Sequence, residues 1–562
     1  MAMFSLLRST LVAAILFFPL QLTVPGQDTH APERDADLAA ADQLFRADKF
    51  AEAEASYQAL LKNDPKLVPA QVGLVRALLG QQKIDEALDA VSAALAAQPN
   101  SAALLAAKGD VQFRSGEMSD AETSYDAAME LDPLGVRAHI GLMRLYGSYS
   151  MYRLAYDQLK SAHEMAPDDF VVQMNWLRML PRKDQLAALE SYLDTPHPGY
   201  EKETKRMAQD LELMKATVDN SVHACRLVSK VEQTETKLVG IIRAITGSAR
   251  ETGVSLSTKV NDHNVLLQLD TGASGIIVAR KLAKATGLTL LSAEHLSGIG
   301  DDGEQSGYKA IADHIHVGDL EFRDCVVHVV DMPGLGDGLI GTNVFGSYVV
   351  DIDLPGKLLK LSPLPKRPED AVALTSLNSE GEEQVNAEQK ESSLTEQTPN
   401  EQKPSAIDPE AARSLPRNRY IAPEMANWTK VFRFGHLMLV PTVVGDSKPM
   451  LFLLDTGFFT SILSLRAGRE VSKVYSENRI GIGGLNGRVK RIYTSKEATL
   501  HFGHLQQKAN GILTLDLSTQ SRQAGTEVSG ILRFETLGHL EVKLDYRDGL
   551  VDFEYDPERQ KR

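Results

Sequence analysis

The sequence predicts a multidomain chain in which an all-α repeat domain is followed by two all-β lobes. Three observations predict this class: a 34-residue period in the first third, an internal duplication in the remainder, and a polar segment between the two copies. The chain has 562 residues, which is too long for one hydrophobic core, so about three or four domains are expected.

The composition limits the classes of partner. Hydrophobic residues make up 43% and charged residues 24%, values typical of a globular protein. The net charge of −15 does not favour nucleic acid or an anionic membrane surface, because either would need a basic patch. Two cysteines, Cys225 and Cys325, are too few for a disulfide framework or a zinc site and allow at most one bridge. Cys325 lies between apolar strand residues and is expected in the core.

The first residues have the pattern of an export signal. One positive charge precedes a 14-residue apolar run, Leu11 to Val24, which is short for a membrane span of about 20 residues. Small residues at Val24 and Gly26 mark a cleavage site, so residues 1–26 are predicted to be a signal peptide. We therefore expect a periplasmic or secreted protein, with membrane contact only if this segment is retained.

A repeat of 34 residues follows the predicted signal. Alanines at a fixed offset let paired helices cross closely, and a proline twelve positions later ends the second helix. The positions are Ala53, Ala87, Ala121 and Ala155, with Pro65, Pro99, Pro133 and Pro167. The pattern resembles the tetratricopeptide repeat, whose period is 34. It predicts an α-helical solenoid over 34–215, and the resemblance implies a concave surface for a peptide or protein partner.

Residues 365–418 form the polar segment. They include 11 acidic and 6 basic residues, and no Phe, Trp or Tyr occurs between Tyr348 and Tyr420. Such a segment buries too little apolar surface to offset its ordering entropy, so it is predicted to be a disordered, flexible linker.

The segments on either side of it, 220–364 and 419–558, are copies of one another. Both alternate apolar residues with glycine turns, which predicts β-strands. The copies match in order from one end to the other: Val265–Gly272 with Met450–Gly457, Gly298-Ile-Gly300 with Gly481-Ile-Gly483, and Val349–Asp353 with Glu541–Asp545.

Each copy contains an apolar strand that runs directly into Asp-Thr-Gly. Glycine allows a tight turn that brings backbone N–H groups towards the carboxylate, and threonine supplies a short hydroxyl for a fixed hydrogen bond. If the two turns face each other, Asp270 and Asp455 would share one proton and hold one water. This arrangement can activate water against an amide.

These residues resemble the aspartic proteases, specifically the retropepsin-like family. Asp270-Thr-Gly-Ala-Ser274 fits the family's first motif, and Gly338-Leu-Ile-Gly-Thr-Asn343 is similar to its second, on a strand behind the aspartate. The resemblance implies two retropepsin-like lobes, a peptide or protein substrate, and neither metal nor organic cofactor. It implies Asp270 and Asp455 as the catalytic pair, turns supported by Thr271, Gly272, Ser274, Thr456 and Gly457, and flap tips at Ile299, Gly300, Ile482 and Gly483.

The second lobe departs from this pattern at two places. Phe458 and Phe459 follow its Asp-Thr-Gly, and Arg533 stands where the first lobe has Gly341. Arg533 can either point outward to solvent or turn inward and pair with Asp455. Because burial of a guanidinium costs several kcal/mol unless it is fully paired, we expect the outward side chain.

Three functions are compatible with the sequence. The first is an exported aspartic endopeptidase with an Asp270/Asp455 dyad and repeats that recruit substrate or partner. The second is a protease formed by first-lobe homodimers, with a degenerate second lobe. The third is a non-catalytic scaffold whose repeats and lobes only bind peptides.

Overall fold

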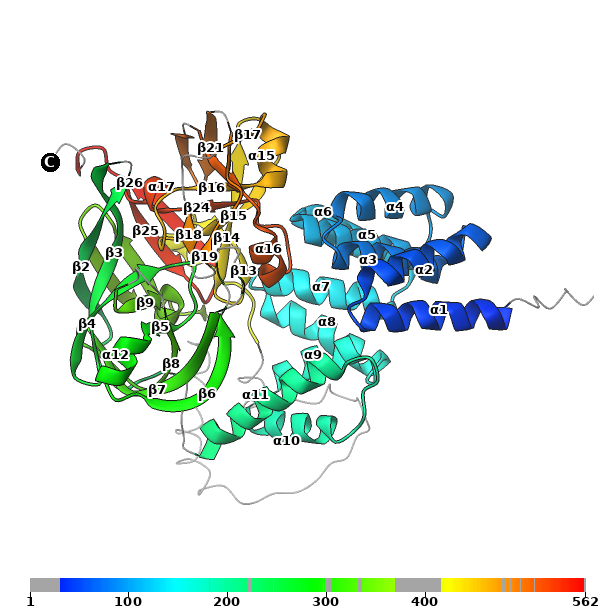
Figure 1. The fold of residues 1–562 in the computed structure, drawn as a ribbon, viewed down its shortest axis with the longest axis horizontal. Helices are drawn as coiled ribbons and strands as arrows, with labels where there is room; N and C mark the ends of the chain where they lie inside the picture. The colour runs from blue at the N-terminus through cyan, green and yellow to red at the C-terminus, as the bar shows by residue number, and fades with distance from the viewer. Residues whose placement is uncertain are drawn as a thin grey trace, which may run out of the picture.

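The computed structural model describes residues 31–180, 182–219, 225–245, 247–296, 298, 303, 305–331, 336–368, 416–477, 482–484, 487–495, 497–509 and 511–559. The predicted signal peptide, residues 1–26, lies outside the described residues, as do residues 369–415 of the predicted linker. Figure 1 shows a helical region beside a β-rich region, the architecture that the sequence predicts.

The helical region contains helix pairs with the predicted period. Helices α2, α4, α6 and α8 each end two residues before one of the repeat prolines, as expected for a residue that cannot continue a helix. The bounds are α1 Ala31–Arg46, α2 Phe50–Asn63, α3 Val68–Gly80, α4 Ile84–Ala97, α5 Ala102–Ser115, α6 Met118–Leu131, α7 Val136–Ser148, α8 Tyr152–Met165, α9 Phe170–Met179, α10 Arg182–Leu193 and α11 Glu201–Asp219.

Small residues set the distance between the helices. The repeat alanines Ala53, Ala87, Ala121 and Ala155 are buried. Tyr57 packs on Gly73, where an added Cβ would lie 2.3 Å from the ring. Close packing of this kind needs a residue without a side chain on the facing helix.

The β-rich region is built from two lobes with short helices. The first lobe contains β1 Arg226–Leu227, β2 Thr234–Ile245, β3 Ser248–Val260, β4 His263–Asp270, β5 Ile276–Ala279, α12 Arg280–Ala285, β6 Thr289–Leu296, β7 Gln305–Val317, β8 Leu320–Val330, β9 Gly338–Gly341, η1 Thr342–Phe345, β10 Tyr348–Asp353 and β11 Leu358–Pro363. The second contains η3 Pro423–Met425, β12 Thr429–Lys430, β13 Phe432–Phe434, β14 Leu437–Val444, β15 Met450–Leu454, β16 Ile462–Ser464, α15 Leu465–Val471, β17 Tyr475–Ser476, β18 Gly483–Gly484, β19 Gly487–Arg488, β20 Tyr493–Thr494, β21 Ala498–Phe502, β22 Leu505–Ala509, β23 Leu513–Leu515, α16 Ser518–Ala524, β24 Gly530–Leu532, α17 Phe534–Leu537, β25 Leu540–Asp545 and β26 Leu550–Tyr555.

The strand pairing repeats the duplication. In the first lobe, β4 runs parallel to β9, and β9 pairs antiparallel with β5. In the second lobe, β15 runs parallel to β24, and β24 pairs antiparallel with β16. Both aspartates therefore leave equivalent strands at the centre of equivalent ladders.

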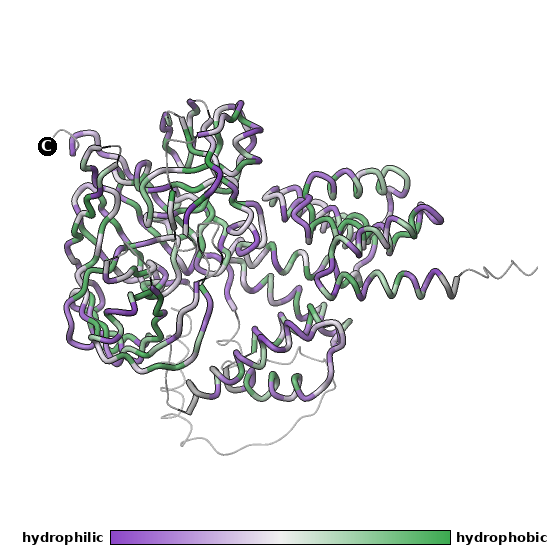
Figure 2. The backbone as a smooth tube through the Cα atoms, viewed as in Figure 1, coloured by the Kyte–Doolittle hydropathy of each residue, from purple (hydrophilic) through white to green (hydrophobic). Residues whose placement is uncertain are grey.

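One sheet joins the lobes. Within the described residues, a 14-stranded sheet has the order β12-β26-β25-β10-β11-β2-β3-β4-β9-β5-β8-β7-β6, with β1 on β8, and a 10-stranded and a two-stranded sheet complete the second lobe. The pairing of β10 with β25 is antiparallel and links residues of the two copies, Val350 with Leu544 for example. Apolar residues of both lobes share one buried cluster, and the hydrophobic segments of Figure 2 run through these strands.

The repeats pack directly against the second lobe. Phe113, Leu142 and Leu145 of the helical region share a buried cluster with Leu439 and Leu453 of β14 and β15. Figure 1 shows α7 and α16 at this boundary. The repeat region is thus seated on the second lobe rather than separate from it.

The two described ends of the predicted linker are packed. Arg367 is buried, and its Nη2 lies 2.5 Å from Asp548 Oδ1. At the other end, Asn418 Oδ1 accepts hydrogen bonds from the backbone N–H groups of Arg153 and Leu154, at 3.0 and 3.1 Å. The flexible segment predicted over 365–418 is therefore too long at both ends, because specific polar partners order those residues.

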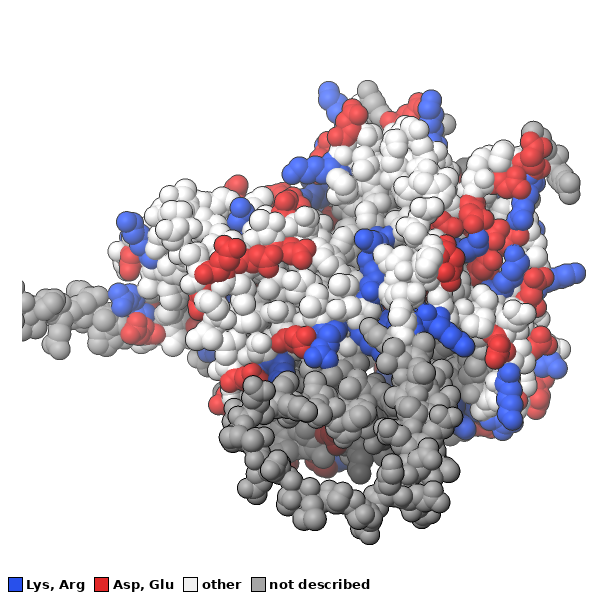
Figure 3. All heavy atoms as spheres, turned by 180° about the vertical axis from the view of Figure 1, so that it is seen from behind, with Lys and Arg blue, Asp and Glu red and all other residues white. Residues whose placement is uncertain are grey.

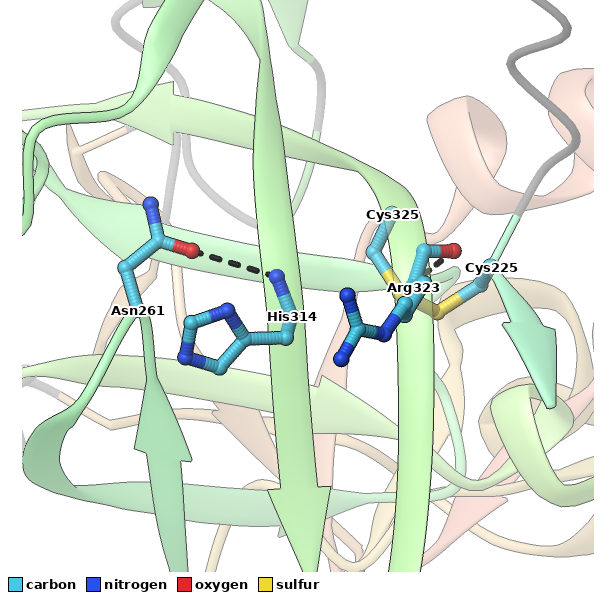
Figure 4. The surroundings of a disulfide bond; sticks show 5 residues. All are labelled: Cys225, Asn261, His314, Arg323 and Cys325. Atoms are coloured by element: carbon cyan, nitrogen blue, oxygen red, sulfur yellow. Dashed lines mark hydrogen bonds between the residues drawn. A yellow bond between two sulfur atoms is a disulfide. The ribbon is translucent and has the colours of Figure 1, made fainter. Parts of the chain in front are cut away.

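Cys225 and Cys325 form a disulfide between the start of β1 and strand β8 (Figure 4). Cys325 is buried, as its apolar neighbours predict. The bridge ties the first residues of the lobe to its sheet, beside the antiparallel pairing of β1 with β8.

Charges on the surface are mixed. Among the described residues on the face drawn in Figure 3, Lys and Arg side chains alternate with Asp and Glu rather than forming one basic patch. No helix within the described ranges has the length and apolar character needed to cross a membrane.

Candidate active site

The Asp-Thr-Gly turns of the two lobes meet at the centre of the β-rich region. Asp270 is the last residue of β4, opposite Gly341 of β9 in the register of that ladder. Asp455 directly follows β15, and its N–H donates to Leu532 O of β24 at 2.9 Å. Each aspartate is thereby fixed by two neighbouring strands.

Glycine in both turns allows the carboxylates to approach each other. The N–H of Gly272 donates to Asp270 Oδ1, and that of Gly457 to Asp455 Oδ1, both at 2.8 Å. An added Cβ would lie 3.1 Å from Asp455 Cγ at Gly272 and 2.3 Å from Asp270 Oδ2 at Gly457. Each turn therefore sits against the aspartate of the other lobe.

The two threonines form a reciprocal hydrogen-bond network. Thr271 N–H donates to Thr456 Oγ1, and Thr456 N–H donates to Thr271 Oγ1, each at 3.1 Å. The hydroxyls then donate to the opposite strands, Thr271 Oγ1 to Leu454 O at 2.9 Å and Thr456 Oγ1 to Leu269 O at 3.0 Å. These four bonds brace the turns against each other within one chain.

The two carboxyl groups lie in an electrostatically asymmetric environment. Asp270 is 8% exposed and Asp455 is 6% exposed. Burial, the charge of Asp455 and a hydrogen bond between the two carboxyls raise the pKa of Asp270 well above its usual range, against the opposing effects of Gly272 N–H and Arg533. Asp270 therefore favours its protonated form.

Arg533 points inward, so the expectation of an outward side chain is wrong. It is 2% exposed, and its Nε lies 3.2 Å from Asp455 Oδ2. Its guanidinium also lies over the ring of Phe458, 4.7 Å from the centroid. Burial lowers the pKa of Arg533, while the carboxylates of Asp455 and Asp270 act in the opposite direction. The ion pair and the aromatic face offset part of the cost of burying this guanidinium, whose Nε and Nη2 atoms are buried without a hydrogen-bond partner among the described residues.

The two departures of the second lobe are therefore linked. In the first lobe, a Cβ at Gly341 would lie 2.4 Å from Ala273 O, so only glycine fits behind that turn. In the second lobe, the backbone N–H of Arg533 donates to Ser461 Oγ at 3.1 Å, and Phe534 N–H donates to Phe458 O at 3.0 Å. This altered turn accommodates a side chain where the first lobe cannot.

Two family models match parts of the chain. Residues 256–344 match a family model described as aspartyl protease, and residues 72–136 match one described as tetratricopeptide repeat. Part of the first β-rich lobe is thus similar to aspartyl proteases, and part of the helical region is similar to tetratricopeptide repeats.

Two curated relatives match parts of the chain. One stretch is 30% identical over 129 residues to DNA damage-inducible protein 1 of Kluyveromyces lactis, covering 22% of this chain and 30% of that protein. Another is 32% identical over 125 residues to a probable UDP-N-acetylglucosamine–peptide N-acetylglucosaminyltransferase, SPINDLY, of Arabidopsis thaliana, covering 22% of this chain and 13% of that one. The chain thus matches less than a third of the length of either relative.

Two solved structures show partial likeness to the chain, both with TM-scores below 0.5. A thermophilic TPR protein of Thermus thermophilus is 16% identical, with 33% of this chain and 99% of that chain covered and a TM-score of 0.27. An O-GlcNAc transferase mutant of Thermobaculum terrenum is 23% identical, with 25% and 27% covered and a TM-score of 0.22.

The other predicted site residues belong to both β-rich lobes. Ser274 is exposed beside the first turn. Ile482 and Gly483 lie at a small hairpin in which β18 pairs with β19, whereas Ile299 and Gly300 lie outside the described residues. Within the described part of the chain, no group of three or more His, Cys, Asp or Glu side chains is arranged to hold a metal ion.

Two residues at the site were not predicted. Gln268 is buried, and its Nε2 donates to Gly457 O across the lobes. It lies two positions before Asp270 on the same strand face, so the strand period of two could have indicated it. His436, half-buried at the turn between β13 and β14, contacts the Gly272 backbone, and burial lowers its pKa. No sequence pattern points to His436, because its counterpart in the first lobe is not a histidine.

Proposed function

We propose that this protein is an aspartic endopeptidase in which Asp270 and Asp455 form the catalytic dyad within a single chain. The observation that carries the proposal is the reciprocal network of Thr271 and Thr456, which holds the two carboxyl groups together. Two aspartates that are so close cannot both ionise easily, so one acts as a base and the other as an acid.

The proposed reaction is the addition of water to a peptide bond. The ionised carboxylate takes a proton from water as the water oxygen attacks the carbonyl carbon, and the protonated carboxyl group donates its proton to the carbonyl oxygen. Collapse of the tetrahedral intermediate then breaks the C–N bond, with a proton passing to the leaving amine. The raised pKa of Asp270 supports its presence as a proton donor.

The packing of the repeats supports a role in substrate recruitment. Because α7 and its neighbours share a buried cluster with β14 and β15, a partner bound to the repeats would be held at a fixed position relative to the dyad. We propose a peptide or protein as this partner.

The test is cleavage of a peptide library by the full chain from about pH 4 to about pH 7.5, with and without an aspartic protease inhibitor. Asp270→Asn and Asp455→Asn should each lower the rate at least about 100-fold, because each removes half of the shared-proton system. Asp446→Asn, in an exposed turn of the second lobe, is the matched control and should cleave normally.

Other outcomes would contradict the proposal. Activity retained by Asp455→Asn and lost in Asp270→Asn would point to first-lobe homodimers. Peptide binding without cleavage by the unaltered chain would point to a scaffold. Activity retained by both variants would exclude the dyad.

We further propose that the protein is exported. The apolar run from Leu11 to Val24 supports this, and so does the disulfide between Cys225 and Cys325, because such bonds persist in oxidising compartments. N-terminal sequencing of the native protein should find a chain that begins near Gln27 in a periplasmic or extracellular fraction. A chain that begins at Met1 in the cytosolic fraction would refute export.

A further inference from the structure

We infer that Arg533 keeps Asp455 ionised, so that Asp270 carries the single proton of the dyad. The consequence for catalysis rests on the proposed function, whereas the charge assignment itself does not. Asp455 would then be the base that takes the proton from water, and Asp270 the acid that protonates the carbonyl oxygen.

The placement of Arg533 carries the inference. Its Nε lies 3.2 Å from Asp455 Oδ2, and both side chains are almost fully buried. A cation at this distance favours the ionised form of a carboxyl group, and solvent screens little of that effect in the interior. Among the described residues, Arg533 makes the only ion pair with either aspartate, so the cation acts mainly on one member of the pair.

The second lobe is built to hold this cation. The Phe458 ring lies against the guanidinium, and Ser461 Oγ accepts a hydrogen bond from the backbone N–H of Arg533, which fixes the backbone that carries this side chain. No equivalent side chain can enter the first lobe, because a Cβ at Gly341 would collide with Ala273 O at 2.4 Å. The asymmetry between the lobes therefore arises from the backbone of each turn.

The other charged and titratable groups around the dyad do not compete with Arg533. His436, from the β13–β14 turn, has its pKa lowered by burial, which favours the neutral ring. Burial raises the pKa of Tyr546 to about 12, which keeps its phenol protonated. The Arg433 guanidinium donates hydrogen bonds to Tyr546 O and to Tyr152 OH. The N–H of Glu535 donates to Phe459 O in the altered turn, and burial raises the pKa of the Glu535 carboxyl group.

The pH profile of cleavage distinguishes this charge-positioning role from a purely structural one. The acid limb of kcat/KM reports protonation of the base in the free enzyme. Removal of the cation disfavours the ionised carboxylate, so Arg533→Met should move that limb upward by about one pH unit or more. Arg533→Lys keeps a positive charge and should move it much less. Arg522→Met, on the exposed face of α16, is the matched control and should leave the profile unchanged.

Two results would overturn the inference. One is an acid limb that stays in place in Arg533→Met. The other is a limb that moves equally in Arg533→Met and Arg533→Lys, which would indicate packing rather than charge. If circular dichroism shows that Arg533→Met does not fold, Arg533→Gln provides the uncharged variant.

A second measurement separates this inference from the proposed function. In the full chain labelled with ¹³C at the aspartate carboxyl groups, the Asp455 signal is assigned by its loss in Asp455→Asn and titrated by NMR. Its midpoint should rise by about one pH unit or more in the uncharged variant, whether or not the chain cleaves peptides. An unchanged midpoint would refute the role of Arg533, while an absence of cleavage with a raised midpoint would refute only the protease.

Discussion

At the scale of single residues, Thr271 and Thr456 each use one hydroxyl twice. The oxygen accepts from the backbone of the opposite turn, and its hydrogen is donated to the opposite strand. Neither turn is complete without the other lobe, since the buried backbone groups find their partners across the interface. Loss of one hydroxyl therefore leaves two backbone groups without their partners.

We predict that Thr271→Val weakens the junction of the lobes. The Thr456 N–H loses its acceptor and Leu454 O loses a donor, and each unsatisfied buried group costs about 1–3 kcal/mol. Native-state hydrogen exchange should show that the free energy protecting the Thr456 amide from exchange falls by about 1–3 kcal/mol. The control is Thr442→Val, whose buried hydroxyl donates to Val440 O of its own strand. Equal exchange in Thr271→Val and the unaltered chain would contradict the prediction.

The partners of Arg533 explain why the prediction of an outward side chain is wrong. Burial of its guanidinium is costly, but the partners that offset this cost are not visible in the sequence. Phe458 lies 75 residues before it, and the value of that ring depends on a turn geometry that only the fold defines. Where two positions differ from a copied motif, as Arg533 and Phe458 do, their side chains can pack against each other in the fold.

At the scale of elements, helix ends of the repeats are completed by the second lobe. The last carbonyls of a helix lack partners within it, and those of α5 accept from lobe residues: Phe113 O from Thr526 Oγ1 at 2.6 Å and Arg114 O from Glu527 N–H at 2.9 Å. The first N–H groups of α8 donate to Asn418. Polar bonds thus fix the orientation of the repeats on the lobe, while apolar contacts supply most of the stabilisation.

We predict that a cavity in α7 loosens strands of the second lobe. Leu145 is fully buried in the cluster shared with β14 and β15, and Leu145→Ala should cost about 2–5 kcal/mol. Hydrogen exchange should therefore accelerate in β14 and β15. The control is Leu78→Ala, which creates a cavity in a separate cluster of α3 and its neighbours and should leave those strands unchanged. If exchange in β14 and β15 is no faster in Leu145→Ala than in Leu78→Ala, the repeats and the lobe are not coupled through this cluster.

At the scale of the whole molecule, strands of the two copies join into one continuous sheet. Strand β10 of the first lobe pairs with β25 of the second, and β11 continues the sheet to β2. The two aspartates are therefore placed by a backbone ladder as well as by the threonines. This arrangement favours pairing within one chain over pairing between two chains.

The helical repeats, the duplication and the two aspartates can all be predicted from the sequence alone. The repeats and their proline stops follow from a period of 34, the strands from alternation, and the matching turns from a copied motif. Each of these signals is either contained within a short segment or repeated along the chain, so it can be recognised without the tertiary structure. The tetratricopeptide and aspartyl protease families are recognisable for the same reason.

The roles of the unrepeated residues, in contrast, emerge only in the folded chain. Arg533 against Asp455, Asn418 at the start of α8, and His436 beside Gly272 each depend on partners between 78 and 265 residues away in the chain. No period or copied motif marks such pairs, because each occurs once. Their free energy depends on burial and on distances of a few ångströms, which are defined only when the lobes and the repeats pack together.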